Sequence, residues 1–134
     1  MLIVLYLQKI KGNDGMGYSL KSLTAELVNK NMANDGLVAF GQNTSGLGGI
    51  LESLGRPMHA ISMVGEQIVI TPFTNKEIIF NKAIAFPRKN IQKAKVSGLL
   101  TGQLTIVMNG GSEYKYNITQ GKPAVKQILS RLGL

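Results

Sequence analysis

The sequence contains no cysteine and no tryptophan, and it has a single histidine, His59, in 134 residues. The absence of cysteine excludes disulfides, iron–sulfur clusters, thiolate zinc sites and a cysteine nucleophile. One imidazole cannot build a multi-histidine metal site, so we expect neither a metal nor a cofactor. A serine hydrolase would have to use His59, and no G-x-S-x-G motif is present to place a nucleophile.

Acidic residues are also scarce, and the charge is unevenly distributed. Seven aspartates and glutamates stand against fifteen lysines and arginines, which gives a net charge of +8. Residues 1–75 carry five side chains of each sign, whereas residues 76–134 carry ten basic and two acidic ones. The excess predicts an anionic partner, such as nucleic acid, a lipid surface or an acidic protein, although it also serves solubility. The scattered carboxylates offer no pair for general acid–base chemistry, so we expect no enzyme.

The chain has no long apolar run. The run LIVLYL at residues 2–7 is six residues long, whereas about 20 are needed to span a bilayer. Lysines follow this run instead of preceding it as they would in a secretory signal, so we expect a cytoplasmic protein. The glycine-rich KGNDGMG after it predicts a flexible or non-native extension over residues 1–17.

An amphipathic helix is predicted at residues 18–33. Leu20, Leu23 and Leu27 follow one another at spacings of three and four, and Ser19 is the expected N-cap. The three leucines form one apolar stripe, which requires a partner surface. The stripe is therefore a candidate self-association face, and we expect a homo-oligomer or a protein partner.

The middle of the chain has the pattern of antiparallel β structure, in which short apolar runs alternate with turn residues. Asn109, Gly110 and Gly111 predict a hairpin, because they tolerate the positive φ of tight reversals. A second hairpin is expected at residues 74–76. The predicted strands occupy residues 37–44, 58–64, 67–73, 77–82, 89–96, 104–108 and 113–118.

A second amphipathic helix is predicted at the end of the chain. Pro123 near its first turn and Gly133 as its stop are typical boundary signals. The residues of its apolar stripe are Val125, Ile128, Leu129 and Leu132. This stripe needs a sheet to cover, so we expect the helix to pack on the predicted β structure.

Four consecutive segments carry a resemblance to a known family. QIVITPFTNKEIIF, FPRKNIQKAKV, GQLTIVMNGGSEYKYNIT and AVKQILSRL resemble the series found in bacterial pleckstrin-homology-like domains, including the GRAM type. The resemblance covers residues 37–134 and rests on apolar positions. It implies a mainly β fold with flanking helices: a bent antiparallel barrel of about seven strands, capped by the C-terminal helix. It also implies a non-catalytic module for binding or self-association.

The loop at residues 45–57 departs from one branch of that family. Pleckstrin-homology domains that bind phosphoinositides use basic residues in and beside the loop between the first two strands, whereas this loop offers Arg56 beside Glu52. Its glycines leave phosphate binding by backbone N–H groups as an alternative, although no nucleotide-binding motif occurs. The main alternative fold is an OB-like barrel, whose helix usually lies between the third and fourth strands instead of at the end.

The segment PRKNIQKAKV is the candidate anion-contacting site. Its basic residues are Arg88, Lys89, Lys93 and Lys95. In a regular strand Ile91 would share a face with three of these lysines, so we expect a bulge. As a functional site the segment would contact phosphates, and the alternative is an edge strand whose lysines prevent aggregation.

Tyr114 and Tyr116 resemble a base-stacking platform. Both share a face with Ile118 in a predicted strand, however, so we expect them in the core. We expect His59 to be a surface residue or a hydrogen-bonded core residue instead of a catalyst, because no acidic partner and placed nucleophile accompany it.

Overall fold

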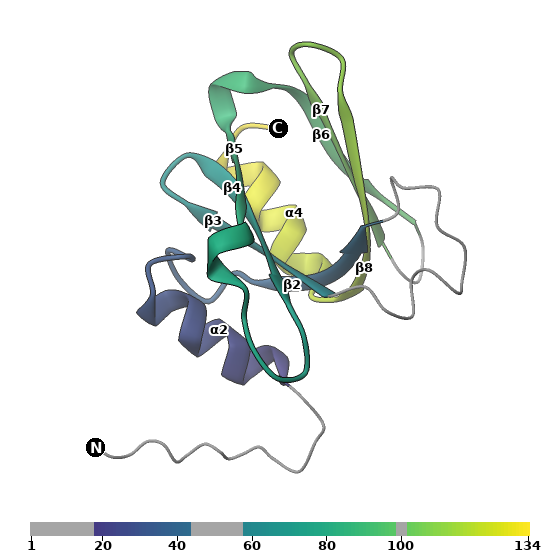
Figure 1. The fold of residues 1–134 in the computed structure, drawn as a ribbon. Coiled ribbons are helices and arrows are strands. Elements are labelled where there is room, and N and C mark those ends of the chain that lie inside the picture. The colour runs from purple at the N-terminus through teal and green to yellow at the C-terminus, as the bar shows by residue number, and fades with distance from the viewer. Residues whose placement is uncertain (1–17, 44–57, 99–101) are drawn as a thin grey trace.

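The computed structural model describes residues 18–43, 58–98 and 102–134. Within these residues, seven antiparallel strands form one sheet that curls into a half-barrel, in the order β5-β4-β3-β2-β8-β7-β6 (Figure 1). The strands are β2 (Ala39–Asn43), β3 (Met58–Val64), β4 (Gln67–Phe73), β5 (Ile84–Pro87), β6 (Ile91–Ser97), β7 (Gly102–Met108) and β8 (Glu113–Gln120). The expectations for residues 1–17 and for the loop at 45–57 lie outside the described residues.

The two α-helices of the described chain, α2 (Leu20–Asn29) and α4 (Lys122–Arg131), lie against opposite faces of the sheet. Val38 and Phe40 pack in the cluster that contains α2, whereas Ala39 between them packs in the cluster that contains α4. Successive residues of a strand point to opposite faces, so α4 fills the concave side and α2 covers part of the convex side. The predicted mainly β fold, a bent antiparallel sheet with a C-terminal helix and a preceding amphipathic helix, is confirmed.

The turn from β8 into α4 depends on Gly121. This residue has a left-handed backbone with φ of 85°, and a Cβ on it would lie 2.9 Å from the carbonyl oxygen of Val38. Glycine is therefore required where the chain turns back toward β2. The stripe of α4 that this turn directs into the half-barrel consists of Val125, Ile128, Leu129 and Leu132, all buried.

The two strands that close the middle of the sheet, β2 and β8, approach each other closely at Gly41. A Cβ on Gly41 would lie 2.8 Å from the backbone oxygen of Asn117, and the register shifts between Phe40 and Gly41. A larger side chain would push the strands apart. The pairing of β2 with β8 therefore joins the strands β2 to β5 to the strands β6 to β8 in one sheet.

The predicted strand at residues 77–82 is wrong. Ile78 forms a single bridge with Phe73, and the 3-10 helix η1 (Phe80–Lys82) follows. Strand pairing resumes only in β5. Ile78 is buried in the cluster under α2, so the chain crosses the end of that cluster before it pairs with β4.

The hairpin predicted at residues 109–111 is present, whereas the one predicted at residues 74–76 forms its turn and then a single bridge instead of a second strand. Thr74 Oγ1 accepts hydrogen bonds from the N–H groups of Lys76 and Glu77, at 3.1 and 3.2 Å, and this tightens the reversal after β4. The hairpin between β7 and β8 is closed by a hydrogen bond of 2.8 Å from Met108 N to Ser112 O. Gly111 has φ of 97°, the conformation for which glycine was expected.

Candidate binding surface on the open half of the sheet

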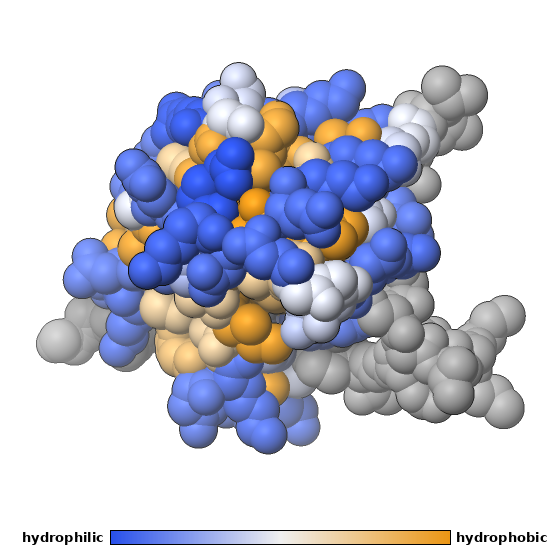
Figure 2. Space-filling model, turned by 90° about the horizontal axis from the view of Figure 1, so that it is seen from above, coloured by the Kyte–Doolittle hydropathy of each residue, from blue (hydrophilic) through white to orange (hydrophobic). Residues whose placement is uncertain are grey.

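The convex side of the sheet has two unlike halves. α2 covers the half formed by β2, β3 and β4, which we call the covered half. Within the described ranges, neither α2 nor α4 lies over the convex side of β6, β7 and β8, which we call the open half. From above, hydrophilic side chains extend over most of the end that carries β5 and the β7–β8 hairpin (Figure 2).

Lysines from two strands meet on the open half. Lys95, Thr105 and Lys115 lie directly opposite one another on β6, β7 and β8. Neighbouring strands are about 4.8 Å apart, so the two lysines start about 10 Å apart across one row. Lys93 lies in the adjacent row, opposite Val107. Lys89 precedes β6 in the 3-10 helix η2 (Arg88–Asn90). We call these four side chains, Lys89, Lys93, Lys95 and Lys115, the basic surface.

A bulge in β6 directs its lysines outward. The pairing of β6 with β7 shifts between Ile91 and Lys93. Because of the extra residue, Ile91 and Ala94 are both buried in the core, whereas Lys93 and Lys95 are exposed. The predicted bulge is confirmed, and it allows two lysines and two core residues to alternate irregularly in one strand.

The middle of the open half is little exposed. Thr105 and Val107 point to the convex side, yet they are only 9% and 8% exposed. Thr105 lies between Lys95 and Lys115, and Val107 lies between Lys93 and Glu113. Long charged side chains of this kind can shield apolar surface with their aliphatic stems while their charged groups stay in water. The one carboxylate in these rows is Glu113, whose Oε1 lies 3.7 Å from Lys115 Nζ. This carboxylate offsets one of the four lysine charges, so the basic surface keeps a net positive charge.

Arg88, the fourth residue of the predicted site, has a structural role. Its Nε donates to the backbone oxygen of Leu132 at 2.7 Å, and its Nη1 donates to that of Ile91 at 3.2 Å. Arg88 thus satisfies a carbonyl at the C-terminal end of α4 and ties it to β6. The structure brings Lys89, Lys93 and Lys95 to the surface and turns Arg88 inward.

The leucine stripe that was predicted as a self-association face packs against the sheet of its own chain. Leu23 and Leu27 are 0% exposed, and Leu20 packs beside them against the covered half. Their partners in the sheet include Val38 and Phe40. A second copy could reach Leu23 and Leu27 only if α2 left the sheet, so these two leucines serve folding in this structure.

The aromatic residues of β8 face the core, as predicted. Tyr116 is 1% exposed, and Tyr114 packs against Phe86 with ring centroids 5.0 Å apart. Burial, with a smaller contribution from Tyr114, raises the pKa of Tyr116 to about 12. The ring of His59 meets Tyr116 edge-on at 5.6 Å. His59 is therefore packed against the core, where an aromatic ring occupies the space beside its imidazole.

Lys115 was missed as a site residue, although a signal for it exists. The turn at residues 109–111 fixes the register of the hairpin, and that register places Lys115 opposite Thr105. The position of Lys95 in the same row was not predictable in this way, because the bulge in β6 shifts its register. The sequence therefore predicts the position of Lys115 in this row but not that of Lys95.

The described residues contain no cluster of three or more potential metal ligands, and none of their helices has the length and apolar character needed to cross a membrane. No family model matches the chain, and no curated protein matches its sequence. What the structure defines is a mainly β half-barrel, with a helix on each side and a basic surface on its open half.

Proposed function

We propose that the protein is a non-catalytic binding module of the pleckstrin-homology-like type found in bacterial proteins, and that it binds an anionic partner in the cytoplasm. The observation that carries this proposal is the contrast between the two halves of the convex side, of which one is covered by α2 and the other is open and basic. The family assignment is supported by the seven antiparallel strands and by the C-terminal helix on their concave side.

The charge of the last part of the chain supports an anionic partner. Residues 91–134 contain six basic side chains and one acidic side chain. A surface of one sign attracts a partner of the opposite sign over about 10 Å at moderate salt, and it raises the rate of encounter. Because the attraction is electrostatic, binding should weaken steeply as salt is added.

Self-association through Leu20, Leu23 and Leu27 is not part of this proposal. Leu23 and Leu27 are buried against the sheet and Leu20 is partly buried beside them, which supports a role of these side chains in folding. A binding role for the open half requires no movement of α2, because Lys93 and Lys95 are already exposed. The basic surface is thus the better supported contact.

The test compares two triple variants of equal charge. Lys89→Gln, Lys93→Gln and Lys95→Gln remove three of the four positive charges of the basic surface, whereas Lys21→Gln, Lys76→Gln and Lys82→Gln remove three exposed lysines elsewhere. Binding to polyglutamate, duplex DNA and phosphatidylserine vesicles is measured by fluorescence anisotropy or co-sedimentation over a range of salt.

The basic-surface triple variant should lose about tenfold or more in affinity for the anionic probe that binds, and its salt dependence should be weaker. The control triple variant should change the affinity by less than about threefold, as expected for charges outside the contact. Equal losses in the two triple variants, or no binding of any probe at low salt, would contradict the proposal.

A further inference from the structure

Strand β6 is an edge of the sheet that the described residues form. It is the last strand in the order, and β7 is its one neighbour among these residues. An edge strand directs alternate N–H and C=O groups away from its neighbour, where they can pair with another chain. β6 is seven residues long, whereas β5 at the opposite edge has four residues and ends in Pro87.

The two ends of this edge are occupied by cationic side chains of the protein. At the start of β6, Arg88 Nη1 donates to the backbone oxygen of Ile91. Just beyond its end, Lys122 Nζ donates to the backbone oxygen of Gly98. Residues 92–97 lie between these two contacts and form an edge of the length that a short extended peptide can pair with.

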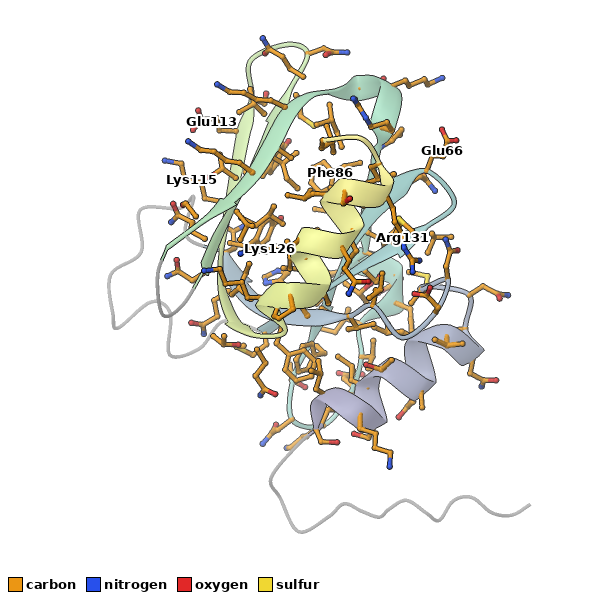
Figure 3. The ribbon with its side chains drawn as sticks, turned by 180° about the vertical axis from the view of Figure 1, so that it is seen from behind. Glu66, Phe86, Glu113, Lys115, Lys126 and Arg131 are labelled. Carbon is orange, nitrogen blue, oxygen red and sulfur yellow. The ribbon has the colours of Figure 1, made fainter. Side chains whose placement is uncertain are left out.

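The sides of the edge differ in chemistry. On the convex side Lys93 and Lys95 are exposed, whereas Ala94 and Val96 point to the concave side and pack in the core. α4 packs against β6 on that concave side, and its Lys126 is also exposed (Figure 3). A strand added beside β6 would alternate its side chains between the lysines and the apolar flank.

Building on the proposed function, we propose that the β6 edge binds an extended acidic segment of another protein, which adds to the sheet as a further strand. Main-chain hydrogen bonds to residues 92–97 would hold the segment, as in β-strand addition generally. Its carboxylates would lie beside Lys93 and Lys95, and small or apolar residues would alternate with them. The proposed partner is thus an extended peptide in which acidic residues alternate with small or apolar ones.

A second copy of the chain fits this edge poorly. Pairing β6 with β6 of another copy would place Lys93 and Lys95 next to the same lysines, and like charges facing each other across strands are destabilising. Pairing β6 with β5 of another copy would use a four-residue strand that ends in Pro87, which has no N–H group to donate. Charge complementarity therefore favours a different, acidic chain.

Nucleic acid also fits less well. The aromatic residues of β8, Tyr114 and Tyr116, face the core, so they cannot stack with unpaired bases. Duplex DNA or an anionic lipid surface would contact the lysines of the basic surface without using the backbone edge of β6. Engagement of that backbone is what separates an acidic peptide from these other anionic partners.

The test uses an eight-residue peptide of alternating glutamate and valine, together with a matched control. The control has the same sequence with N-methyl groups on two adjacent central residues, which keeps the charge and blocks both edges of the peptide. Affinity is measured by fluorescence anisotropy, and backbone amide hydrogen exchange is measured across the full-length protein. Duplex DNA and phosphatidylserine vesicles are run in parallel.

We expect the unmodified peptide to bind at least about tenfold more tightly than the methylated one, because only it can pair its backbone. It should slow amide exchange in residues 92–97, and Lys93→Gln with Lys95→Gln should weaken its binding. Equal binding of the two peptides, with dependence on the lysines retained, would overturn the edge site and leave the proposed function intact. Slowed exchange in β6 that depends on protein concentration without peptide would instead identify a second copy as the occupant and overturn the inference.

Discussion

The covered and open halves of the convex side are built from one sheet, yet their side chains serve different purposes. In the covered half, Phe40 and Phe73 pack under Leu23 and Leu27 of α2. In the open half, the outward positions of β6 carry the exposed Lys93 and Lys95, and their partners on β7 are Thr105 and Val107, which are little exposed. The concave side does not show this difference, because α4 is buried against strands of both halves. The comparison indicates that the first half of the convex side contributes stability and that the second is available for binding.

The largest effect is expected from a change beneath α2. Leu23→Ala should lower the free energy of unfolding by about 2–5 kcal/mol, because it leaves a cavity at a position with no exposed surface. Urea denaturation followed by circular dichroism measures the loss. Lys95→Ala in the open half is the matched control, and it should change stability by less than about 0.5 kcal/mol. A small loss for Leu23→Ala would mean that α2 is not part of the folded core.

A change of opposite sign is expected at Thr71, also in the covered half. The hydroxyl of Thr71 is buried and has no hydrogen-bond partner among the described residues. Thr71→Val should therefore raise the free energy of unfolding by about 1 kcal/mol, since it removes an unsatisfied polar atom with little change in shape.

The nearby Ser62 is the control for this prediction. Its Oγ donates to the backbone oxygen of Met32 at 2.6 Å, which ties β3 to the segment after α2. Ser62→Ala should lower stability by about 1 kcal/mol, because it leaves that carbonyl without its donor. Thermal unfolding measures both variants, and two shifts of the same sign would contradict this description of the interface.

The smallest effect is expected where the covered half meets α4. Arg131 Nη1 lies 2.8 Å from Asp35 Oδ2, and both side chains are about half exposed. The hydrogen bond from Arg131, and secondly that from the backbone of Leu37, lowers the pKa of Asp35. Its contribution to stability is therefore present above about pH 4 and is lost as the pH falls further.

Asp35→Asn tests this contact with little change in shape. At pH 7 the variant should be less stable by under about 1 kcal/mol, as is usual for exposed ion pairs. The difference from the unmodified protein should shrink in urea titrations at pH 3. Arg131→Gln should give the same loss, and the double variant should lose no more than either single change. Additive losses would show that the two residues act independently.

Most of the architecture could be predicted from the sequence, because patterns of period two and 3.6 are local. The apolar stripes of the two helices and the hairpin at residues 109–111 were correct for this reason. The surface that the stripe of α2 packs against was not predicted correctly. An apolar stripe does not show whether its partner surface belongs to the same chain or to another one. A signal was nonetheless present, since the consecutive apolar residues Val38, Ala39 and Phe40 indicate a strand that is buried on both faces.

The candidate site was predictable only in part. Lys89, Lys93 and Lys95 of the basic segment are exposed, but Arg88 donates a hydrogen bond to the backbone oxygen of Leu132 at the end of α4, 44 residues further along the chain. No local pattern reports such a contact. Similarly, residues 77–82 have strand-like composition, yet Ile78 is drawn into the cluster under α2 and the strand forms later. Tertiary packing decided both positions.

The most direct measurement is a titration of isotope-labelled protein with polyglutamate, followed by backbone amide chemical shifts. If the open half is the binding surface, the shifts will concentrate in residues 88–97, β7 and β8, and they will disappear at high salt. Shifts concentrated in α2, β3 and β4, with the amides of β6 unchanged, would contradict the division of the convex side into a stabilising half and a binding half.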